Sequence, residues 1–371
     1  MKTFFNLIQE IQKEGKCNLC GGCVTFCSAI NHEALGVDSD GWPYFKAIDK
    51  CIECGLCYSI CSQTNELDNE IKKDAQWKEP FGKVIEISVA RAKDESLRDM
   101  GTDGAIVSAI LIHLFDTQRI DGAIVSKNTR YGRVSFLAKS KEDIFASTGI
   151  HFTKSHGMVD FAHDYSTFSP STSELKELKN HSLERVAFVG VPCQINTIRK
   201  MQALDLVPSE IIKYCFGIFC SGNYYFSERF LNLLEEKYGF SCKEVKKINV
   251  KEAFIISLFS GEQVLIPLHE LDRVKRLACD FCDDFSAGYA DISFGGTGAP
   301  SGWTTAITRT QIGKAVFNDA LKNKLETYRV DDNPQYITLA EKKIKIMSEL
   351  KKQRADYSKT SLENAGIKVI G

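Results

Sequence analysis

The 371-residue sequence contains little tryptophan, proline or methionine, and it has no long apolar run. Since about 20 consecutive apolar residues are needed to cross a bilayer, no membrane-spanning segment is predicted. The 47 basic and 48 acidic side chains leave a formal net charge of −1, which gives no bulk electrostatic basis for binding nucleic acid or lipid. The first fifteen residues include Glu10 and Glu14 and lack the cationic and then apolar layout of a signal peptide. We therefore expect a cytoplasmic protein of two or three domains.

Cysteine, in contrast, is abundant, and in a cytosolic chain this indicates metal or redox use rather than disulfides. Eight of the fourteen cysteines form two runs with the spacing C-x2-C-x2-C-x3-C. Such a run supplies three thiolates to one [4Fe-4S] cluster, and its fourth cysteine binds the other cluster. The expected ligands are therefore Cys17, Cys20, Cys23 and Cys61 for the first cluster, and Cys51, Cys54, Cys57 and Cys27 for the second.

A zinc site or a disulfide framework is the alternative for these runs. Zinc takes four ligands per ion, usually from paired C-x2-C motifs, and does not require a third evenly spaced cysteine in both runs. Glycines at Gly21, Gly22 and Gly55 favour clusters, because they let backbone N–H groups approach the sulfides. Ser28 and Ser62 stand where two-cluster ferredoxins usually have proline, which affects the local turn and the cluster potential rather than the ligation.

The pattern predicts an α+β chain, with a bacterial-type two-[4Fe-4S] ferredoxin module ahead of a mixed α/β domain. We place the module at residues 1–68, a charged linker at 69–83, the mixed domain at 84–330 and a helical extension at 331–371. The module is expected to hold a helix over 1–16 and a hairpin around Asp40-Gly41. The mixed domain is expected to contain βαβ-like units, a hairpin and several further elements. The expected elements are a first βαβ-like unit over 84–126, a second over 185–219, a helix over 224–234, a hairpin at 253–268, strands at 290–294 and 304–310, and a helix after the last strand.

A second set of cysteines lies in the mixed domain. Cys279 and Cys282 form a C-x2-C pair, Cys193 follows Pro192 at a strand end, and Cys220 ends an apolar strand. Four ligands from three loops would suit a third [4Fe-4S] cluster, whereas the alternative is a set of buried, inert cysteines. Cys215 and Cys242 are interpreted as core or surface residues. Spacing alone leaves both interpretations of the four cysteines open.

Several ordered motifs resemble the family of coenzyme F420 hydrogenase/dehydrogenase beta subunits, and with the glycine turn at 101–104 the resemblance spans about residues 84–325. The motifs are Val189-Gly190-Val191-Pro192-Cys193-Gln194-Ile195, Gly217-Ile218-Phe219-Cys220, Cys279-Asp280-Phe281-Cys282-Asp283, and Ala290-Asp291-Ile292-Ser293 through Gly302-Trp303. Members of this family are iron–sulfur flavoproteins that hold FAD and pass a hydride between FAD and the deazaflavin coenzyme F420. The resemblance thus implies that the mixed domain binds FAD, and that Cys193, Cys220, Cys279 and Cys282 hold a third cluster beside the flavin.

A ferredoxin module ahead of this domain is similar to the electron-input subunit of archaeal F420H2 dehydrogenases, which feeds a membrane-bound complex. It also resembles the N-terminal half of a deazaflavin-dependent sulfite reductase, but no sirohaem-binding half is present here. The expected activity is oxidation of reduced coenzyme F420, with electrons passing through FAD, the third cluster and the two ferredoxin clusters to a partner subunit. A flavin suits this task because the deazaflavin donates hydride whereas iron–sulfur clusters accept single electrons.

Candidate cofactor contacts come from the turn at the predicted helix start, from residues near 148–154 and from the glycine-rich loop before Trp303. The turn would offer N–H groups to a pyrophosphate, although a helix start capped by Thr102 or Asp103 is the simpler alternative. Lysine near a flavin stabilises its anionic reduced form, and Trp303 would flank a planar ring. The predicted contacts are Gly101, Thr102, Asp103, Gly104, Thr148, Gly149, Lys154, Pro192, Gly295, Gly296, Gly298, Gly302 and Trp303.

Basic residues must also hold the phosphate and glutamyl tail of the deazaflavin, and the sequence suggests Arg199, Lys200, Arg273, Lys275 and Arg276. No catalytic proton donor is assigned, because hydride transfer needs little acid–base help. Two further functions remain open: a ferredoxin-linked flavoprotein reductase of another acceptor, and an electron-relay subunit without a substrate site.

Overall fold

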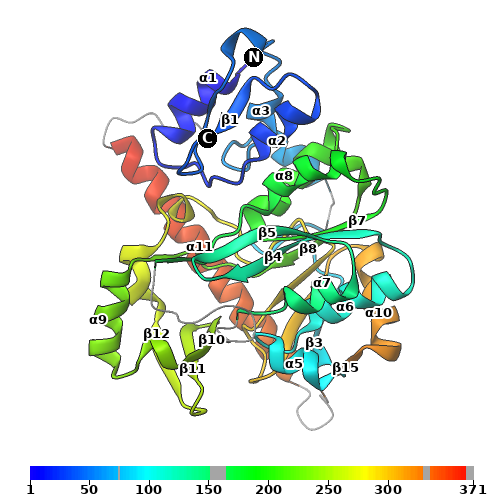
Figure 1. Cartoon of the computed structure of the whole chain (residues 1–371), viewed down its shortest axis with the longest axis vertical. Coiled ribbons are helices and arrows are strands. Elements are labelled where there is room, and N and C mark those ends of the chain that lie inside the picture. Colours follow the sequence, from blue (N-terminus) through cyan, green and yellow to red (C-terminus); the bar gives the residue numbers. More distant parts are fainter. Residues whose placement is uncertain (74–75, 151–163, 329–334, 365–371) are drawn as a thin grey trace.

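The computed structural model describes residues 1–73, 76–150, 164–328 and 335–364. It has a mixed α+β fold with a long twisted sheet at the centre (Figure 1). In this view the N-terminal part lies above one end of helix α8, and a small three-stranded sheet lies below the central sheet. No described helix is both long and apolar enough to cross a membrane.

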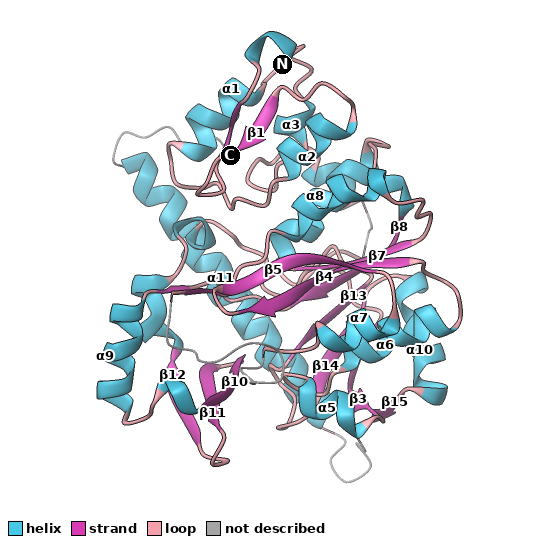
Figure 2. Ribbon diagram, in the orientation of Figure 1, coloured by secondary structure: helices cyan, strands magenta, loops and turns pink. Residues whose placement is uncertain are grey.

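The central sheet is mixed and has ten strands. Strands are magenta in Figure 2. Its four middle strands, β13, β8, β7 and β4, run parallel to one another, while β14, β3 and β15 on one side and β5 on the other pair antiparallel. In spatial order the strands are β15 (Leu325–Thr327), β3 (Glu86–Ala92), β14 (Thr304–Thr308), β13 (Ile292–Gly295), β8 (Ile212–Ile218), β7 (Val186–Gly190), β4 (Gly122–Thr129), β5 (Gly132–Ala138), β6 (Tyr165–Ser166) and β9 (Tyr225–Phe226).

Both faces of the middle strands are buried, which explains why their sequences are nearly continuous apolar runs. Side chains alternate across a strand, so Ala123 and Val125 of β4 join one core cluster and Ile124 joins another. The helices that cover the first face are α6 (Ile106–Asp116) and α10 (Gln311–Asn323); the second face packs against α8 (Pro192–Ala203) and the 3₁₀ segment Ser171–Asn180. Two shorter helices of the mixed domain are α5 (Glu95–Met100) and α7 (Lys141–Ala146). The domain also contains 3₁₀ turns at Ser209–Ile211, Cys242–Glu244, Leu268–Val274 and Leu277–Asp280.

The N-terminal module, residues 1–68, is a small unit of short elements around its own apolar cluster, in which Phe4, Leu7 and Tyr58 are buried. The expected hairpin is present, with Leu35 paired to Phe45 and Val37 to Pro43. The elements are α1 (Phe4–Leu7), a π-helical turn (Ile8–Gln12), α2 (Gly22–Ala29), β1 (Leu35–Val37), β2 (Pro43–Phe45), a 3₁₀ turn (Ile48–Lys50), α3 (Leu56–Ser59) and the start of α4 (Asp68–Ile71).

The two cysteine runs share a backbone device. Gly21 and Gly55 each follow the second cysteine of a run, and both have a positive φ (79° and 73°) immediately before a helix. A side chain would be strained at either position, so glycine lets each loop turn sharply from its second cysteine into the helix that carries the third.

The N-terminal module is packed firmly against the rest of the chain. Phe26 and Ile60 belong to the same core cluster as Phe188 and Ile195. The fully buried Lys200 of α8 donates hydrogen bonds to the carbonyl oxygens of Cys61 (3.1 Å) and Thr64 (2.6 Å). The predicted linker is likewise held at its end, because buried Arg309 donates to the carbonyl oxygens of Phe81 and Lys83 at 2.8 and 2.7 Å. These contacts favour a fixed module over one that swings on its linker.

Two predicted elements differ from the structure. Strands β3 and β4 do not form a βαβ unit, because β14, β13, β8 and β7 lie between them and β3 pairs antiparallel with β14. The predicted helix at 224–234 begins later, as α9 (Glu228–Tyr238): Tyr225 and Phe226 first form an edge strand, and the Ser227 hydroxyl caps the helix by accepting from the N–H of Phe230. Tertiary pairing of the aromatic pair outweighs its local helical pattern.

Two further parts complete the fold. A three-stranded antiparallel sheet contains β10 (Val245–Val250), β11 (Ala253–Leu258) and β12 (Gln263–Pro267), and it includes the predicted hairpin. The last helix, α11 (Tyr336–Asn364), runs diagonally past the central sheet toward the N-terminal module (red in Figure 1). Its Ile344 and Met347 pack against Phe81, Phe219 and Phe285.

Candidate functional site

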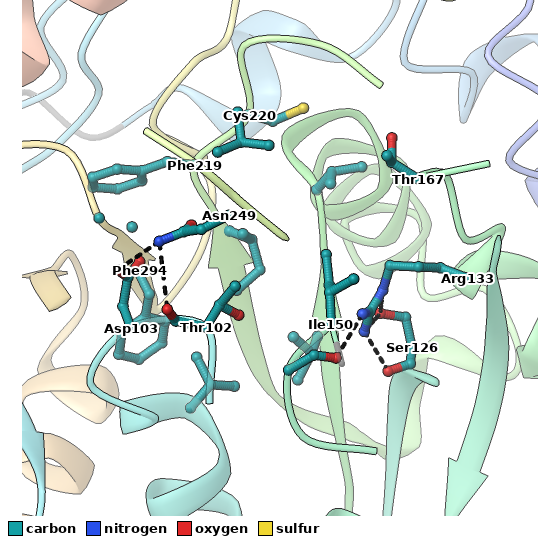
Figure 3. Close-up of a pocket in the computed structure, with 18 of the residues that line it drawn as sticks. Thr102, Asp103, Ser126, Arg133, Ile150, Thr167, Phe219, Cys220, Asn249 and Phe294 are labelled. Atoms are coloured by element: carbon teal, nitrogen blue, oxygen red, sulfur yellow. Dashed lines mark hydrogen bonds between the residues drawn. The ribbon is translucent and has the colours of Figure 1, made fainter. Parts of the chain in front are cut away.

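A cavity of about 330 Å³ opens at the carboxyl ends of the four parallel strands. Residues that end β7, β8 and β13 line it, among them Gly190, Phe219 and Gly295. This is the position where open α/β sheets bind ligands, and the volume lies in the usual range for a cofactor site. Figure 3 shows Asp103 and Asn249 on one side of it, together with the apolar Phe219 and Phe294, and Arg133 and Ser126 on the opposite side.

The turn before α6 forms one wall of the cavity. The N-cap of α6 is Ala105, in a left-handed conformation and without a side-chain cap, so the predicted cap by Thr102 or Asp103 is wrong. Asp103 instead accepts a hydrogen bond from Asn249 Nδ2 and pairs with Lys251 Nζ, each at 2.8 Å (Figure 3). The first N–H groups of a helix have no intrahelical partner. An uncapped helix start facing a cavity is therefore suited to an anionic group such as a pyrophosphate.

Arg133 organises the opposite wall. Its guanidinium donates to the carbonyl and hydroxyl oxygens of Ser126 at 2.7 and 2.8 Å and to the carbonyl oxygen of Gly149 at 2.9 Å (Figure 3). Burial lowers the pKa of Arg133. Nearby, the Thr148 hydroxyl contacts that of Ser108 at 2.9 Å and so ties the end of α7 to the first turn of α6.

The structure brings seven of the predicted cofactor contacts to this cavity and places five others elsewhere. Gly104 donates its N–H to Thr304 Oγ1, and Pro192 starts α8 beside Cys193. Gly298 packs against Ala340 of α11, Gly302 is exposed, and Lys154 lies outside the described residues. The contacts that line the cavity are Gly101, Thr102, Asp103, Thr148, Gly149, Gly295 and Gly296.

Trp303 also departs from its predicted position. It does not line the cavity but makes an edge contact with Tyr328, and the Arg91 guanidinium lies over its ring at 4.3 Å. The loop 295–302 leaves the cavity after Thr297, where Gly298 packs against Ala340 of α11 and its carbonyl oxygen accepts a hydrogen bond from Tyr336. A flanking role for Trp303 at a planar ring therefore has no support from the geometry.

None of the basic residues suggested for the deazaflavin tail lines the cavity. Arg199 pairs with Asp291 at 2.9 Å, Lys275 pairs with Asp272 and Asp280, and Arg276 donates to the carbonyl oxygen of Asn18. Two basic residues that the sequence did not point to line the cavity: Arg133, and Lys251, which lies just after the end of β10. Close by, Lys247 donates to the carbonyl oxygen of Gly101 at 3.3 Å, and burial lowers the pKa of its ammonium group.

The eight cysteines of the N-terminal module gather in two places, and none forms a disulfide. The thiol of Cys17 interacts electrostatically with those of Cys61 and Cys20. The thiol of Cys57 interacts in the same way with those of Cys54, Cys51 and Cys27. Small cavities lie among them; one is lined by Cys17, Cys20, Cys23, Cys57 and Cys61, and the other by Cys27, Cys51, Cys54 and Cys57. In the described part of the chain, no three His, Cys, Asp or Glu side chains lie close enough to hold a single metal ion.

This arrangement fits two four-iron clusters. Each cluster would be ringed by the thiols that the crossed-over spacing assigns to it. Burial raises the pKa of Cys57 to about 12 and that of Cys61 to about 11, and bound iron would offset this cost because metal ligands are thiolates.

The second set of cysteines forms a group beside the main cavity. Cys220 lines the cavity, and electrostatic interactions connect its thiol with those of Cys279 and Cys282. Asn223 contacts two of these sulfurs: its N–H donates to Cys279 Sγ at 3.4 Å and its side-chain amide to Cys220 Sγ at 3.6 Å. Cys193, on α8, completes the group. Cys215 and Cys242 are buried in other core clusters.

Cys193 also lies within electrostatic range of Cys20 of the N-terminal module. Thr197, one helical turn after Cys193, lines the small cavity that Cys17, Cys20 and Cys23 also line. The first cysteine run, rather than the second, thus adjoins the cysteine group of the mixed domain.

A cavity at the carboxyl ends of parallel strands, bordered by a half-buried group of cysteines, is typical of an oxidoreductase of mixed α+β fold. Residues 87–159 and 183–333 match the N-terminal and C-terminal parts of the family described as coenzyme F420 hydrogenase/dehydrogenase, beta subunit. The chain belongs to this family.

Relatives with assigned names support this membership. The chain is 30% identical to the beta subunit of the coenzyme F420 hydrogenase of Methanococcus voltae over 71% of this chain and 91% of that protein. It is 27% identical to one subunit of the F420H2 dehydrogenase of Methanosarcina mazei, covering 64% of this chain and 63% of that protein. An uncharacterised protein of Methanocaldococcus jannaschii is 30% identical over 95% of this chain and 98% of its own length, so the likeness extends into the N-terminal module.

The fold likewise has a counterpart among solved structures. A chain of the F420-reducing [NiFe] hydrogenase complex from Methanosarcina barkeri superimposes with a TM-score of 0.62 at 24% identity, over 77% of this chain and 94% of that chain.

Proposed function

We propose that this chain oxidises reduced coenzyme F420 as the electron-input subunit of a larger redox assembly, in the manner of an F420H2 dehydrogenase component. It would hold FAD in the main cavity and three [4Fe-4S] clusters on the twelve grouped cysteines, and it would act in the cytoplasm beside a partner subunit. The observation that carries this proposal is the shared position of Cys220, which lines the cavity and also belongs to the third cysteine group.

Bound FAD would accept a hydride from the reduced deazaflavin and release its two electrons singly, which is the form that iron–sulfur clusters carry. The chain's own residues prepare the cavity for it. The uncapped start of α6 offers N–H groups to the pyrophosphate. The Asp103–Lys251 pair holds that turn in place, and Arg133 joins β4 to the backbone at Gly149.

The cysteine positions support one order of electron passage. The third group adjoins the cavity at Cys220 and adjoins the first cysteine run at Cys193 and Cys20. The cluster on Cys51, Cys54, Cys57 and Cys27 would come last in the order from the cavity through the third group and the first run. Ile48 and Ile52, close to these cysteines, are exposed. We therefore assign that end to the partner subunit.

A reductase of another acceptor is the second candidate. It is favoured by 31% identity to the coenzyme F420-dependent sulfite reductase of Methanocaldococcus jannaschii, of which the chain covers 34%. A pure relay subunit is less favoured, because it would need no cavity of about 330 Å³ beside the cysteines.

The decisive test is anaerobic. The purified protein should contain about twelve irons and one FAD, and it should oxidise reduced coenzyme F420 with a viologen acceptor. Full cofactor content without deazaflavin oxidation would favour the second candidate. About eight irons without flavin would leave only the relay function.

Replacing Asp103 tests the cavity itself. Asp103→Ala removes the carboxylate that joins Lys251 and Asn249 to the turn before α6, and it leaves the Lys251 ammonium without its partner in a largely buried site. We expect FAD to bind at least about tenfold more weakly, or about 1.4 kcal/mol, measured by flavin titration of the deflavinated protein.

Glu252→Ala is the matched control, because Glu252 follows Lys251 but pairs with Lys343 on the exposed side. Equal flavin affinity in the Asp103 variant and the wild type would place the flavin elsewhere.

A further inference from the structure

The last helix, α11, carries a buried lysine against the third cysteine group. The side chain of Lys351 is 4% exposed, and its Nζ donates to the carbonyl oxygens of Cys220 at 2.7 Å and Asp284 at 2.8 Å. One carbonyl belongs to a predicted cluster ligand, and the other lies two residues beyond Cys282. Lys351 thus ties together the two loops that supply three of the four cysteines.

A buried ammonium group is costly unless negative charge compensates it. Among the described residues, Lys351 forms no ion pair with a carboxylate within 4.0 Å. The groups that act on it most strongly are the thiols of Cys282, Cys220 and Cys279. The negative charge that compensates this lysine comes from the cysteine group, once its thiols act as ligands, and from the Asp284 carboxylate, which also interacts with Lys351.

Arg354, one turn later on α11, contacts the same loops. Its guanidinium donates to the carbonyl oxygens of Ser221 at 2.8 Å and Cys279 at 3.1 Å. It also lies 3.5 Å from Asp280, so a carboxylate offsets its charge. Of the two cations, Lys351 is the one whose charge is directed at the sulfurs.

We propose that Lys351 is a positioning residue for the third cluster, and that its buried positive charge raises the reduction potential of that cluster. The inference rests on the proposed function only through the assignment of Cys193, Cys220, Cys279 and Cys282 as ligands. The physical reason is that reduction adds negative charge to the cluster, and a nearby fixed cation stabilises the reduced state. Lys351 lies outside both segments that match the family, so the match itself does not imply this role.

The test is an anaerobic redox titration of the full chain, monitored by electron paramagnetic resonance. The signal of the third cluster is identified as the one that Cys279→Ala abolishes. Lys351→Met removes the charge and keeps the length of the side chain, Lys351→Arg keeps the charge, and Lys352→Met is the neighbouring control, since Lys352 pairs with Asp356 at the surface.

We expect the Lys351→Met protein to keep its irons and to show that one potential shifted to a more negative value. A tenfold change in the ratio of reduced to oxidised cluster corresponds to about 59 mV for one electron. The arginine variant should stay near the wild-type value, and the Lys352 control should not move.

An unchanged potential in Lys351→Met with full iron, or an equal shift in Lys352→Met, would overturn the inference. If Lys351→Met loses irons, the Lys351→Arg protein becomes the test of the inference. Full iron content and a wild-type potential in Lys351→Arg would support the role of the charge, and loss of the same irons would refute it. About eight irons in the wild type would instead overturn the proposed third cluster, and the inference with it.

Discussion

Cys279→Ala should remove about four of about twelve irons and leave the two clusters of the N-terminal module in place. Cys279 lies within electrostatic range of Cys220 and Cys282, and its sulfur accepts the N–H of Asn223. Neither Cys215 nor Cys242 is placed to replace the lost thiolate, because both lie in other core clusters. Iron and sulfide analysis of the anaerobically purified protein measures the loss.

Cys242→Ala is the matched control, since it removes another buried thiol and should keep all the irons. Equal iron content in the Cys279 variant and the wild type would show that the second set of cysteines is inert. The proposed electron path from the cavity to the N-terminal module would then lack the cluster on Cys193, Cys220, Cys279 and Cys282.

Lys200→Met should destabilise the attachment of the N-terminal module by about 3–5 kcal/mol. The fully buried ammonium group donates to two carbonyl oxygens of the segment that contains Cys61, and it pairs with Asp68 at 2.8 Å. Methionine fills a similar volume but leaves these oxygens without a donor. Urea unfolding, followed by the loss of cluster absorbance, reports the change.

The exposed Lys213, which bonds only to the nearby carbonyl oxygen of Glu210, provides the control variant Lys213→Met. An unchanged midpoint for Lys200→Met would mean that the apolar contacts of Phe26 and Ile60 hold the module without help from the lysine. A lowered midpoint together with slower electron transfer to viologen would indicate that this interface also carries the electron path.

The sequence alone determined features that depend on neighbours along the chain. The spacing of the first eight cysteines predicted two groups of four, and the structure has two small cavities among these thiols, beside loops that turn at Gly21 and Gly55. The apolar runs of β7 and β8 likewise predicted buried parallel strands, because a strand that is buried on both faces consists of a continuous run of apolar residues.

Only the tertiary structure decided which distant segments meet. Lys251 reaches the cavity from the end of β10, and Lys351 reaches the cysteine group from a helix whose sequence resembles an ordinary lysine-rich surface. Trp303, predicted to flank a cofactor, instead meets Arg91 and Tyr328, and Gly298 in the loop before it packs against α11. A basic or aromatic side chain looks the same in the sequence whether solvent or a cofactor cavity surrounds it. Its environment is set by contacts between residues that lie tens to hundreds of positions apart.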